Sequence, residues 1–277
     1  MLNIIKSDLY RIFRGKSLYI VTAIIIFMAV ISAITLSPGH IGVAVGTGST
    51  MTDPDTVAKI AEAKTLGEFR DVMKEIGTIK LDAQIIGQNS NLYYFFIVFV
   101  VVIITSDFSN KSVKNTLSSA ISRREYYFSK LITVIGMGTV LVLFNDFINY
   151  VLNYVINGKE FASEIGYITK ISLIQIPVVW TLICMLVCIA FFVRKTSVFN
   201  TISIPLLMIL QVIAVILFAI LRETPKWYTD FELQYVLSNM ANEPSNSYII
   251  KCFVLSTVYI VAFVTAGYCA FKNAEVK

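Results

Sequence analysis

Residues 171–193 read ISLIQIPVVWTLICMLVCIAFFV, and this stretch decides the fold. It contains 23 consecutive residues without a charged side chain. A helix needs about 20 such residues, each adding about 1.5 Å, to cross the hydrocarbon layer of a membrane. A soluble domain has few places for so long an apolar run, because much of its surface must still face water. The stretch therefore predicts a membrane-spanning helix.

Five further segments, on both sides of this stretch, meet the same criterion. They are Leu18–Leu36, Leu92–Thr105 within the uncharged region 83–106, Leu131–Ile156, Ser197–Leu221 and Cys252–Phe271. The composition agrees, since 15% of the residues are charged, against about 25% in an average soluble chain. The sequence also lacks the short alternating segments of a transmembrane β-barrel. We predict an all-α membrane protein with six transmembrane helices in one domain, residues 1–277.

Lysine and arginine gather on one side of the predicted helices. Segments 1–16, 107–130, 194–195 and 272–277 hold 13 basic residues in 48 positions, whereas 37–91, 157–170 and 222–251 hold 10 in 99. Basic segments stay in the cytoplasm. We therefore predict a multi-pass protein of the cell (plasma) membrane with both termini cytoplasmic. The net charge of +5 requires no nucleic-acid partner, because the positive charge lies beside the lipid bilayer.

Three segments outside the spans also have interpretable patterns. Residues 1–16 predict an amphipathic interfacial helix, with an apolar stripe of Leu2, Ile5, Leu9, Ile12 and Phe13; the alternative is a plain basic flank that sets topology. Residues 37–90 predict an extracellular loop carrying a helical hairpin, because capping signals occur at Asp53-Pro54 and Thr65–Glu68. Residues 222–251 predict an extracellular cap whose aromatic side chains anchor it to headgroups or, alternatively, grip a substrate.

Asp146 is an ionisable residue well inside a predicted span, and Asn145, Asn149 and Asn153 recur beside it. Polar groups are costly in hydrocarbon, so this stripe must face protein or a water-filled space. One hypothesis is that the four residues line a translocation path between subunits; the other is that they form interhelical hydrogen bonds. Gln175 and Gln211 are candidates for the same interior.

Several kinds of catalytic site are excluded or unsupported by the sequence. The four cysteines lie in apolar blocks and are interpreted as buried hydrophobic residues, and the single histidine is His40. Gly15-Lys16-Ser17 ends like a phosphate-binding loop, but Tyr10 occupies the position where that motif requires glycine. Zinc-protease and nucleophile-elbow motifs do not occur. We expect no enzymatic activity, cofactor or metal site in this chain.

The segment 107–130, DFSNKSVKNTLSSAISRREYYFSK, is the most informative loop. It is polar and 24 residues long. Leu117, Ile121 and Phe128 are spaced so that one short helix could pack its apolar side against another surface. Such a loop is suited to docking a soluble protein under the membrane. The alternative is a basic loop that only fixes topology.

This segment resembles the permease subunits of ATP-binding cassette transporters of the type-2 exporter class. Asp107 matches their acidic residue, Thr116-Leu117 lie in the apolar helix, Ser122-Arg123 match the Ser-Arg pair, and Lys130 closes the pattern. Lys111-Ser112 replaces the usual Gly-Thr, and Ala120 replaces the usual proline. The layout of an amphipathic start, six spans and an outer cap before the sixth span is also similar.

The resemblance implies a half-transporter whose loop 107–130 is a cytoplasmic coupling helix. Two separate nucleotide-binding ATPases would dock there, carrying the ATP and Mg²⁺, and a second permease copy or paralogue would complete a homo- or heterodimer. The implied coupling residues are Asp107, Lys114, Leu117, Ile121, Ser122, Arg123 and Lys130. By analogy alone, the substrate is an amphipathic or antimicrobial peptide, giving peptide resistance, or another hydrophobic compound. The alternatives are a secondary transporter or channel, a membrane-embedded enzyme, and a non-transporting sensor or assembly subunit.

Overall fold

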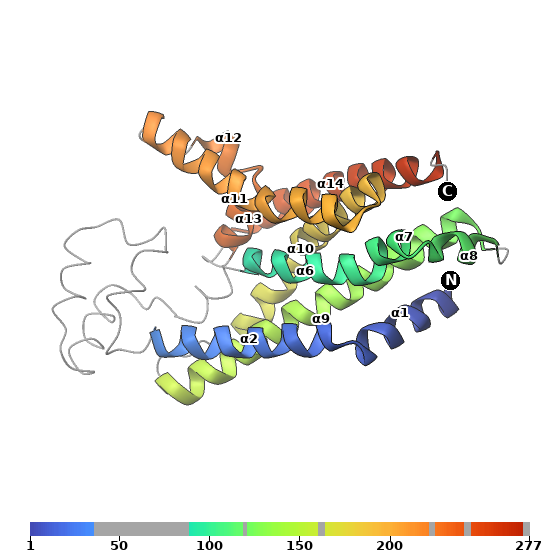
Figure 1. Ribbon diagram of the computed structural model, residues 1–277. Coiled ribbons are helices and arrows are strands. Elements are labelled where there is room, and N and C mark those ends of the chain that lie inside the picture. The colour runs from blue at the N-terminus through green and yellow to red at the C-terminus, as the bar shows by residue number, and fades with distance from the viewer. Residues whose placement is uncertain (36–88, 119–120, 160–163, 222–224, 241–244, 274–277) are drawn as a thin grey trace, which may run out of the picture.

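The computed structural model describes residues 1–35, 89–118, 121–159, 164–221, 225–240 and 245–273, and every regular element in these ranges is a helix (Figure 1). In chain order they are α1 (Leu2–Arg14), α2 (Lys16–Thr35), the 3-10 turn η2 (Asn89–Leu92), α6 (Tyr93–Val100), the π-helical turn η3 (Val101–Thr105), α7 (Ser106–Ser109), α8 (Ser112–Ser118), α9 (Arg123–Asn157), α10 (Ile165–Val193), α11 (Thr196–Leu221), α12 (Lys226–Thr229), α13 (Leu233–Met240) and α14 (Asn246–Lys272). The helical hairpin expected within 37–90 lies outside the described residues.

In the part of the chain that the structure describes, six helical segments are long and apolar enough to cross a membrane. They are Lys16–Ile34, Asn89–Ser109, Arg123–Ile156, Ile165–Val193, Thr196–Leu221 and Asn246–Lys272. The prediction of an all-α membrane protein with six spans is therefore confirmed. In Figure 1, α1, α8 and the end of α14 lie at one end of the bundle, and α12 and α13 lie at the other.

The amphipathic helix α1 forms as predicted, but its buried face differs from the predicted stripe. The buried residues are Ile4, Asp8 and Ile12, whereas Leu2 and Phe13 are exposed. Ile4, Asp8 and Ile12 face the bundle because the Asp8 carboxylate pairs with basic side chains there, as described below. Leu2 and Phe13 are left on the outer side, where a helix at the membrane interface meets lipid.

Helix α10 occupies the centre of the bundle. It packs against α9 and α14 most extensively, and also against α6, α11 and α13. Its side chains Val178, Leu182, Leu186 and Ala190 are inaccessible to solvent, which explains why residues 171–193 are apolar on all sides. By contrast, α11 and α2 expose many large apolar side chains, so their outer faces must be covered by lipid or by another protein.

The second span is helical throughout but not uniform. It passes from the 3-10 turn η2 through α6 and the π-helical turn η3 into α7. A π-helical turn contains one extra residue and shifts the backbone hydrogen bonds. Here the hydroxyl groups of Thr105 and Ser106 donate to the carbonyls of Val101 and Val102, which supports the altered turn. Uncharged length alone, the basis of the sequence prediction, does not reveal such a turn.

Helix α9 begins at Arg123, eight residues before the predicted start at Leu131. The cause is a capping box at Ser122 and Glu125: the Ser122 hydroxyl accepts from the Glu125 amide at 3.1 Å, and the Glu125 carboxylate accepts from the Ser122 amide at 3.2 Å. The last eight residues of the expected loop 107–130 are therefore helical. With 35 residues, α9 is about 52 Å long, so it extends well beyond the hydrocarbon layer.

The expected cap at 222–251 contains α12 and α13 within its described part. Tyr228 is buried and donates a hydrogen bond to the Leu210 carbonyl of α11 at 2.6 Å, while Trp227 and Phe231 are exposed. Val236, Leu237 and the rest of the apolar face of α13 pack toward α10 and η2. The exposed aromatic residues suit the interfacial anchoring that the sequence suggests.

Helices α14 and α10 approach each other closely at Gly267 of α14. A Cβ atom at this position would lie 2.8 Å from the Tyr127 hydroxyl and 3.2 Å from the Cys188 Cα atom of α10. The Tyr127 hydroxyl also donates to the Val264 carbonyl at 3.0 Å, which ties α9 to α14. Because the Cys188 contact is with backbone, a side chain at 267 must push α14 away from α10.

We predict that Gly267→Val lowers the stability of the protein in detergent by about 1–3 kcal/mol, because the side chain separates the helices and disrupts the Tyr127 hydrogen bond. Thermal unfolding monitored by circular dichroism measures this effect. The control is Gly136→Ala in α9, where an added Cβ meets nothing within 4 Å, so stability is unchanged or higher. Equal melting temperatures for Gly267→Val and the wild-type protein contradict the close packing.

Candidate functional site

Four charged side chains meet where α1, α7 and α9 come together. We call Asp8, Arg11, Asp107 and Lys130 the charge cluster. The Lys130 Nζ atom lies 2.6 Å from Asp107 Oδ2 and 2.8 Å from Asp8 Oδ1. Arg11 pairs with Asp107 Oδ1 through Nη1 and with Asp8 Oδ1 at 3.1 Å through Nη2. Two positive and two negative charges balance within the cluster.

Two neighbouring groups add to the charge cluster. The Tyr126 hydroxyl donates to Asp107 Oδ2 at 3.0 Å, and the Lys130 Nζ atom lies 5.2 Å from the centre of the Tyr126 ring. Arg11 Nη2 also donates to the Ile103 carbonyl at 3.1 Å. Ile103 lies in the π-helical turn η3, so Arg11 satisfies a carbonyl oxygen of the turn in the second span. The cluster thus joins α1, η3, α7 and α9.

Three residues of the charge cluster are buried, and the fourth, Arg11, is partly exposed, with 38% of its side-chain surface accessible. Asp107, Lys130 and Asp8 expose 6%, 2% and 4% of their surface, so Asp107 and Lys130 are not available for direct contact with a soluble protein. Burial raises the pKa of Asp8, although Lys130 and Arg11 oppose that rise. Asp8 Oδ2 accepts no hydrogen bond from the described residues. Asp107 and Lys130 therefore act by holding helices in position.

Sequence reasoning identified Asp107 and Lys130 but missed Asp8 and Arg11. A signal existed, because Ile4, Asp8 and Ile12 follow one another every four residues and so share one face of a helix. An acidic residue on a buried face requires a basic partner. The sequence could not show which of the chain's basic residues would reach it.

The remaining expected coupling residues lie around α8 and the start of α9. Ser122 caps α9, and Arg123 donates from Nη1 to the carbonyls of Phe271 and Lys272 at the end of α14, at 3.1 and 2.7 Å. Leu117 and Ile121 are partly buried against the bundle. Lys114 is exposed. The structure therefore places Ser122 and Arg123 in helix-end contacts and leaves α8 with an outward face.

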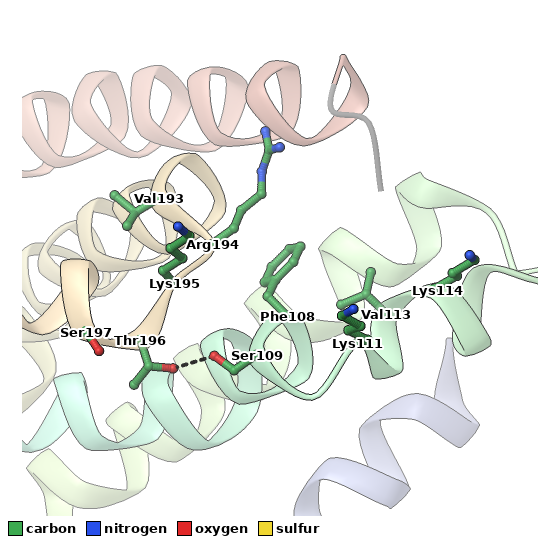
Figure 2. Close-up of a pocket in the computed structure, with 10 residues that line it drawn as sticks. All are labelled: Phe108, Ser109, Lys111, Val113, Lys114, Val193, Arg194, Lys195, Thr196 and Ser197. Carbon is green, nitrogen blue, oxygen red and sulfur yellow. Dashed lines mark hydrogen bonds between the residues drawn. The ribbon is translucent and has the colours of Figure 1, made fainter. Parts of the chain in front are cut away.

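A pocket of about 680 Å³ lies beside α8. Figure 2 shows its two walls, which are the turn between α7 and α8, with Lys111, and the turn between α10 and α11, with Arg194 and Lys195. The hydroxyl groups of Ser109 and Thr196 bond to each other across the pocket at 2.9 Å. The loop that carries α8 is thereby connected to the turn between the fourth and fifth spans.

A second polar group of residues lies farther along α9, and we call Asn89, Asn145, Asp146, Asn149 and Gln175 the amide cluster. Asn89 Nδ2 donates to Asp146 Oδ1 at 2.9 Å and to Gln175 Oε1 at 2.8 Å, and Asn89 Oδ1 accepts from Asn145 Nδ2 at 2.9 Å. Asn149 Nδ2 donates to the Asn145 carbonyl at 2.8 Å. Gln175 Nε2 donates to the Leu237 carbonyl of α13 at 3.1 Å.

The polar stripe of α9 therefore faces the interior of its own chain. Asp146, Asn149 and Asn153 expose 3% or less of their surface. Gln175 belongs to the interior as expected, but Gln211 is exposed on α11 and does not. Within one chain the arrangement is one of interhelical hydrogen bonds, and Asp146 Oδ2 and Asn149 Oδ1 remain without donors among the described residues. The translocation-path hypothesis stays a prediction.

We predict that Lys130→Met destabilises the protein by about 3–5 kcal/mol, because it leaves two buried carboxylates with Arg11 as the cation that they share. The double variant Lys130→Met/Asp107→Leu removes a balanced pair and recovers much of that loss. Melting temperatures in detergent measure both effects, and Lys114→Met at an exposed position is the control. Equal losses in the single and double variants contradict the assigned pairing.

The amide cluster gives a second prediction. Asp146→Asn keeps an acceptor for Asn89 and changes stability little, whereas Asp146→Leu leaves the buried Asn89 amide short of a partner and costs about 1–3 kcal/mol. Detergent melting temperatures separate the two variants. A higher melting temperature for Asp146→Leu than for the wild-type protein indicates that the stripe faces lipid instead.

Comparison with known proteins agrees with this architecture. The family model of the C-terminal domain of the multidrug efflux system permease Rv1217c matches residues 21–272. This region runs from α2 to the last residue of α14 and includes all or most of each of the six spans. No curated protein matches the chain. The chain is thus a membrane-spanning transport permease, and it belongs to the family of the C-terminal domain of the multidrug efflux permease Rv1217c.

Proposed function

We propose that this permease is the membrane subunit of an ATP-driven exporter of the type-2 class of ATP-binding cassette transporters. Two separate nucleotide-binding ATPases dock at α8 from the cytoplasm and bind the ATP and Mg²⁺. A second permease copy or paralogue completes the translocation path, and both termini are cytoplasmic. The proposed substrates are amphipathic or antimicrobial peptides and other hydrophobic compounds, in keeping with the multidrug efflux family.

The charge cluster is the observation that carries this proposal. Helix α8 follows α7 after the short turn at Asn110 and Lys111. Asp107 in α7 is joined to Lys130 of α9 by a buried ion pair and to Arg11 of α1 by a partly buried one. A displacement of α8 is therefore passed through α7 to α9 and α1. A loop that only fixed topology would need no such attachment.

The outward face of α8 supports a docking role. Lys114, Asn115 and Ser118 are exposed, whereas Val113 on the opposite side is buried against the bundle. The helix is thus fixed to the protein along one side and open to a partner along the other. Leu117 in α8 and Ile121 after it are half-buried against the bundle. They therefore hold α8 in place more than they contact a partner.

The proposed cycle also gives α9 a role in transmission. Asp146 follows Lys130 by 16 residues, or about 24 Å along the helix, so α9 connects the charge cluster with the amide cluster. In this proposal, a movement of α9 separates Asn145, Asp146 and Asn149 from Asn89 and Gln175. The freed polar groups then line the path, next to the second permease subunit.

The α8 face supplies the test of the proposed function. We predict that Asn115→Trp abolishes co-purification of the proposed cassette ATPase, and with it export of an amphipathic peptide from cells. The protein itself still inserts and melts normally, because Asn115 is exposed. The control is Ser7→Trp, an exposed position of α1 at the same end of the bundle. Wild-type ATPase stoichiometry in the Asn115→Trp variant refutes docking at α8.

A further inference from the structure

The pocket between α8 and the α10–α11 turn takes no part in the transmission proposed above. Its lining contains four cationic residues, Lys111, Lys114, Arg194 and Lys195, and no acidic residue. We propose that this pocket binds the phosphate-bearing headgroup of an anionic membrane phospholipid. The proposal concerns a lipid site of the permease itself and does not depend on ATPase docking.

The charges of the pocket differ from those of the nearby charge cluster. Within the cluster, each cation has a carboxylate partner. By contrast, the ion pairs found in the described part of the chain do not include Lys111, Lys114 or Lys195. Three lysines gathered around one hollow repel each other unless an anion lies between them. An external phosphate group provides that anion.

Arg194 contributes to the pocket in a different way. Its side chain turns toward α14, where Nη2 donates to the Ala270 carbonyl at 3.0 Å, and Nε donates to the Phe191 carbonyl at 3.1 Å (Figure 2). Arg194 therefore fixes the wall of the pocket, and the lysines remain to contact a ligand. The Ser197 hydroxyl on the lining is a further donor to phosphate oxygens. The Thr196 hydroxyl instead donates to Thr105 at 3.1 Å and is bonded to Ser109.

The backbone of both walls is unusual. Lys111 and Arg194 have φ angles of 57° and 58°, and they are the non-glycine residues with positive φ among those that the structure describes. Residues other than glycine pay a conformational cost in this region, which is most often retained at functional sites. Glycine at either turn would avoid that cost, yet both positions carry a cation at the pocket.

The depth of the pocket favours a lipid headgroup over a soluble anion or an acidic protein segment. The fourth span ends at Val193 and the fifth begins at Thr196, so the lining lies at the border between hydrocarbon and headgroups. Beside it, Phe192, Val198 and Ile202 expose 57%, 43% and 42% of their surface. Those apolar side chains suit acyl chains. Basic pockets between spans at this depth are known to hold anionic headgroups.

Native mass spectrometry of the full-length protein in nanodiscs tests the proposal. The nanodiscs contain equal amounts of phosphatidylglycerol and phosphatidylcholine, and the measurement is the ratio of the two lipids retained by each protein. We expect the wild-type protein to prefer phosphatidylglycerol. Lys111→Gln/Lys114→Gln/Lys195→Gln reduces that preference at least about ten-fold, given a roughly five-fold effect for each cation near an anionic surface.

The matched control is Lys6→Gln/Lys16→Gln/Arg124→Gln, which removes three exposed cations at the same end of the bundle but outside the pocket. This variant keeps the preference. Lys111→Gly removes one charge while supplying the residue that the turn conformation favours, so it lowers the preference without disturbing the fold. Melting temperatures verify that each variant is folded.

Three results overturn the proposal. The first is equal retention of both lipids by the wild-type protein, and the second is an unchanged preference in the pocket variant. The third is displacement of the bound lipid by excess inorganic phosphate, which indicates a site for the free anion. An unchanged lipid preference combined with loss of the ATPase assigns the pocket to an acidic protein partner instead.

Discussion

A buried ion pair between Lys130 and Asp107 holds one end of this protein together. Both side chains are almost completely buried, so the charge of each is tolerated because an opposite charge lies beside it. Asp8 and Arg11 enter the same network and bring α1 with them. Without the pair, α1 would be held mainly by Ile4 and Ile12, and the π-helical turn at Ile103 would lose the donor that Arg11 provides. The position of α8, which follows α7 directly, depends on the same contacts.

The charge cluster and the amide cluster, both of which include residues of α9, satisfy buried polar atoms in different ways. Hydrocarbon offers no hydrogen bonds, so every buried polar group must be satisfied within the protein. The charge cluster does so with full charges, whose pairing is strong and depends closely on geometry. The amide cluster relies mostly on Asn and Gln side chains, each of which both donates and accepts and can change partners. Asn89 illustrates this, since it donates to Asp146 and Gln175 and accepts from Asn145.

The spans could be predicted from the sequence because a run of uncharged residues reports directly on a requirement of the membrane. The details of the site could not, because they depend on which side chains meet in space. Asp107 and Lys130 were identified by resemblance, yet their burial and their pairing with Asp8 and Arg11 depend on how α1 packs. The apolar stripe of α1 could be predicted, but apolar residues occur on two sides of this helix, so the sequence did not show that Ile4, Asp8 and Ile12 would face the bundle. The start of α9 at Arg123 could have been predicted from the sequence, because Ser122 and Glu125 have the spacing of a capping box.

The distribution of these contacts bears on how a transporter built this way would move. In the proposed cycle, α8 receives the movement of an ATPase, and the ion pairs of Asp107 make α7, α1 and the start of α9 follow as one body. At the far end of α9, the amides can exchange hydrogen bonds with little change in free energy, so displacement there costs less than at the charge cluster. The outer faces of α2 and α11 are apolar, so lipid or a partner would contact them without directional interactions. In the proposed cycle, rigid attachment at the charge cluster and exchangeable hydrogen bonds at the amide cluster would together allow α9 to transmit motion and to open a polar lining.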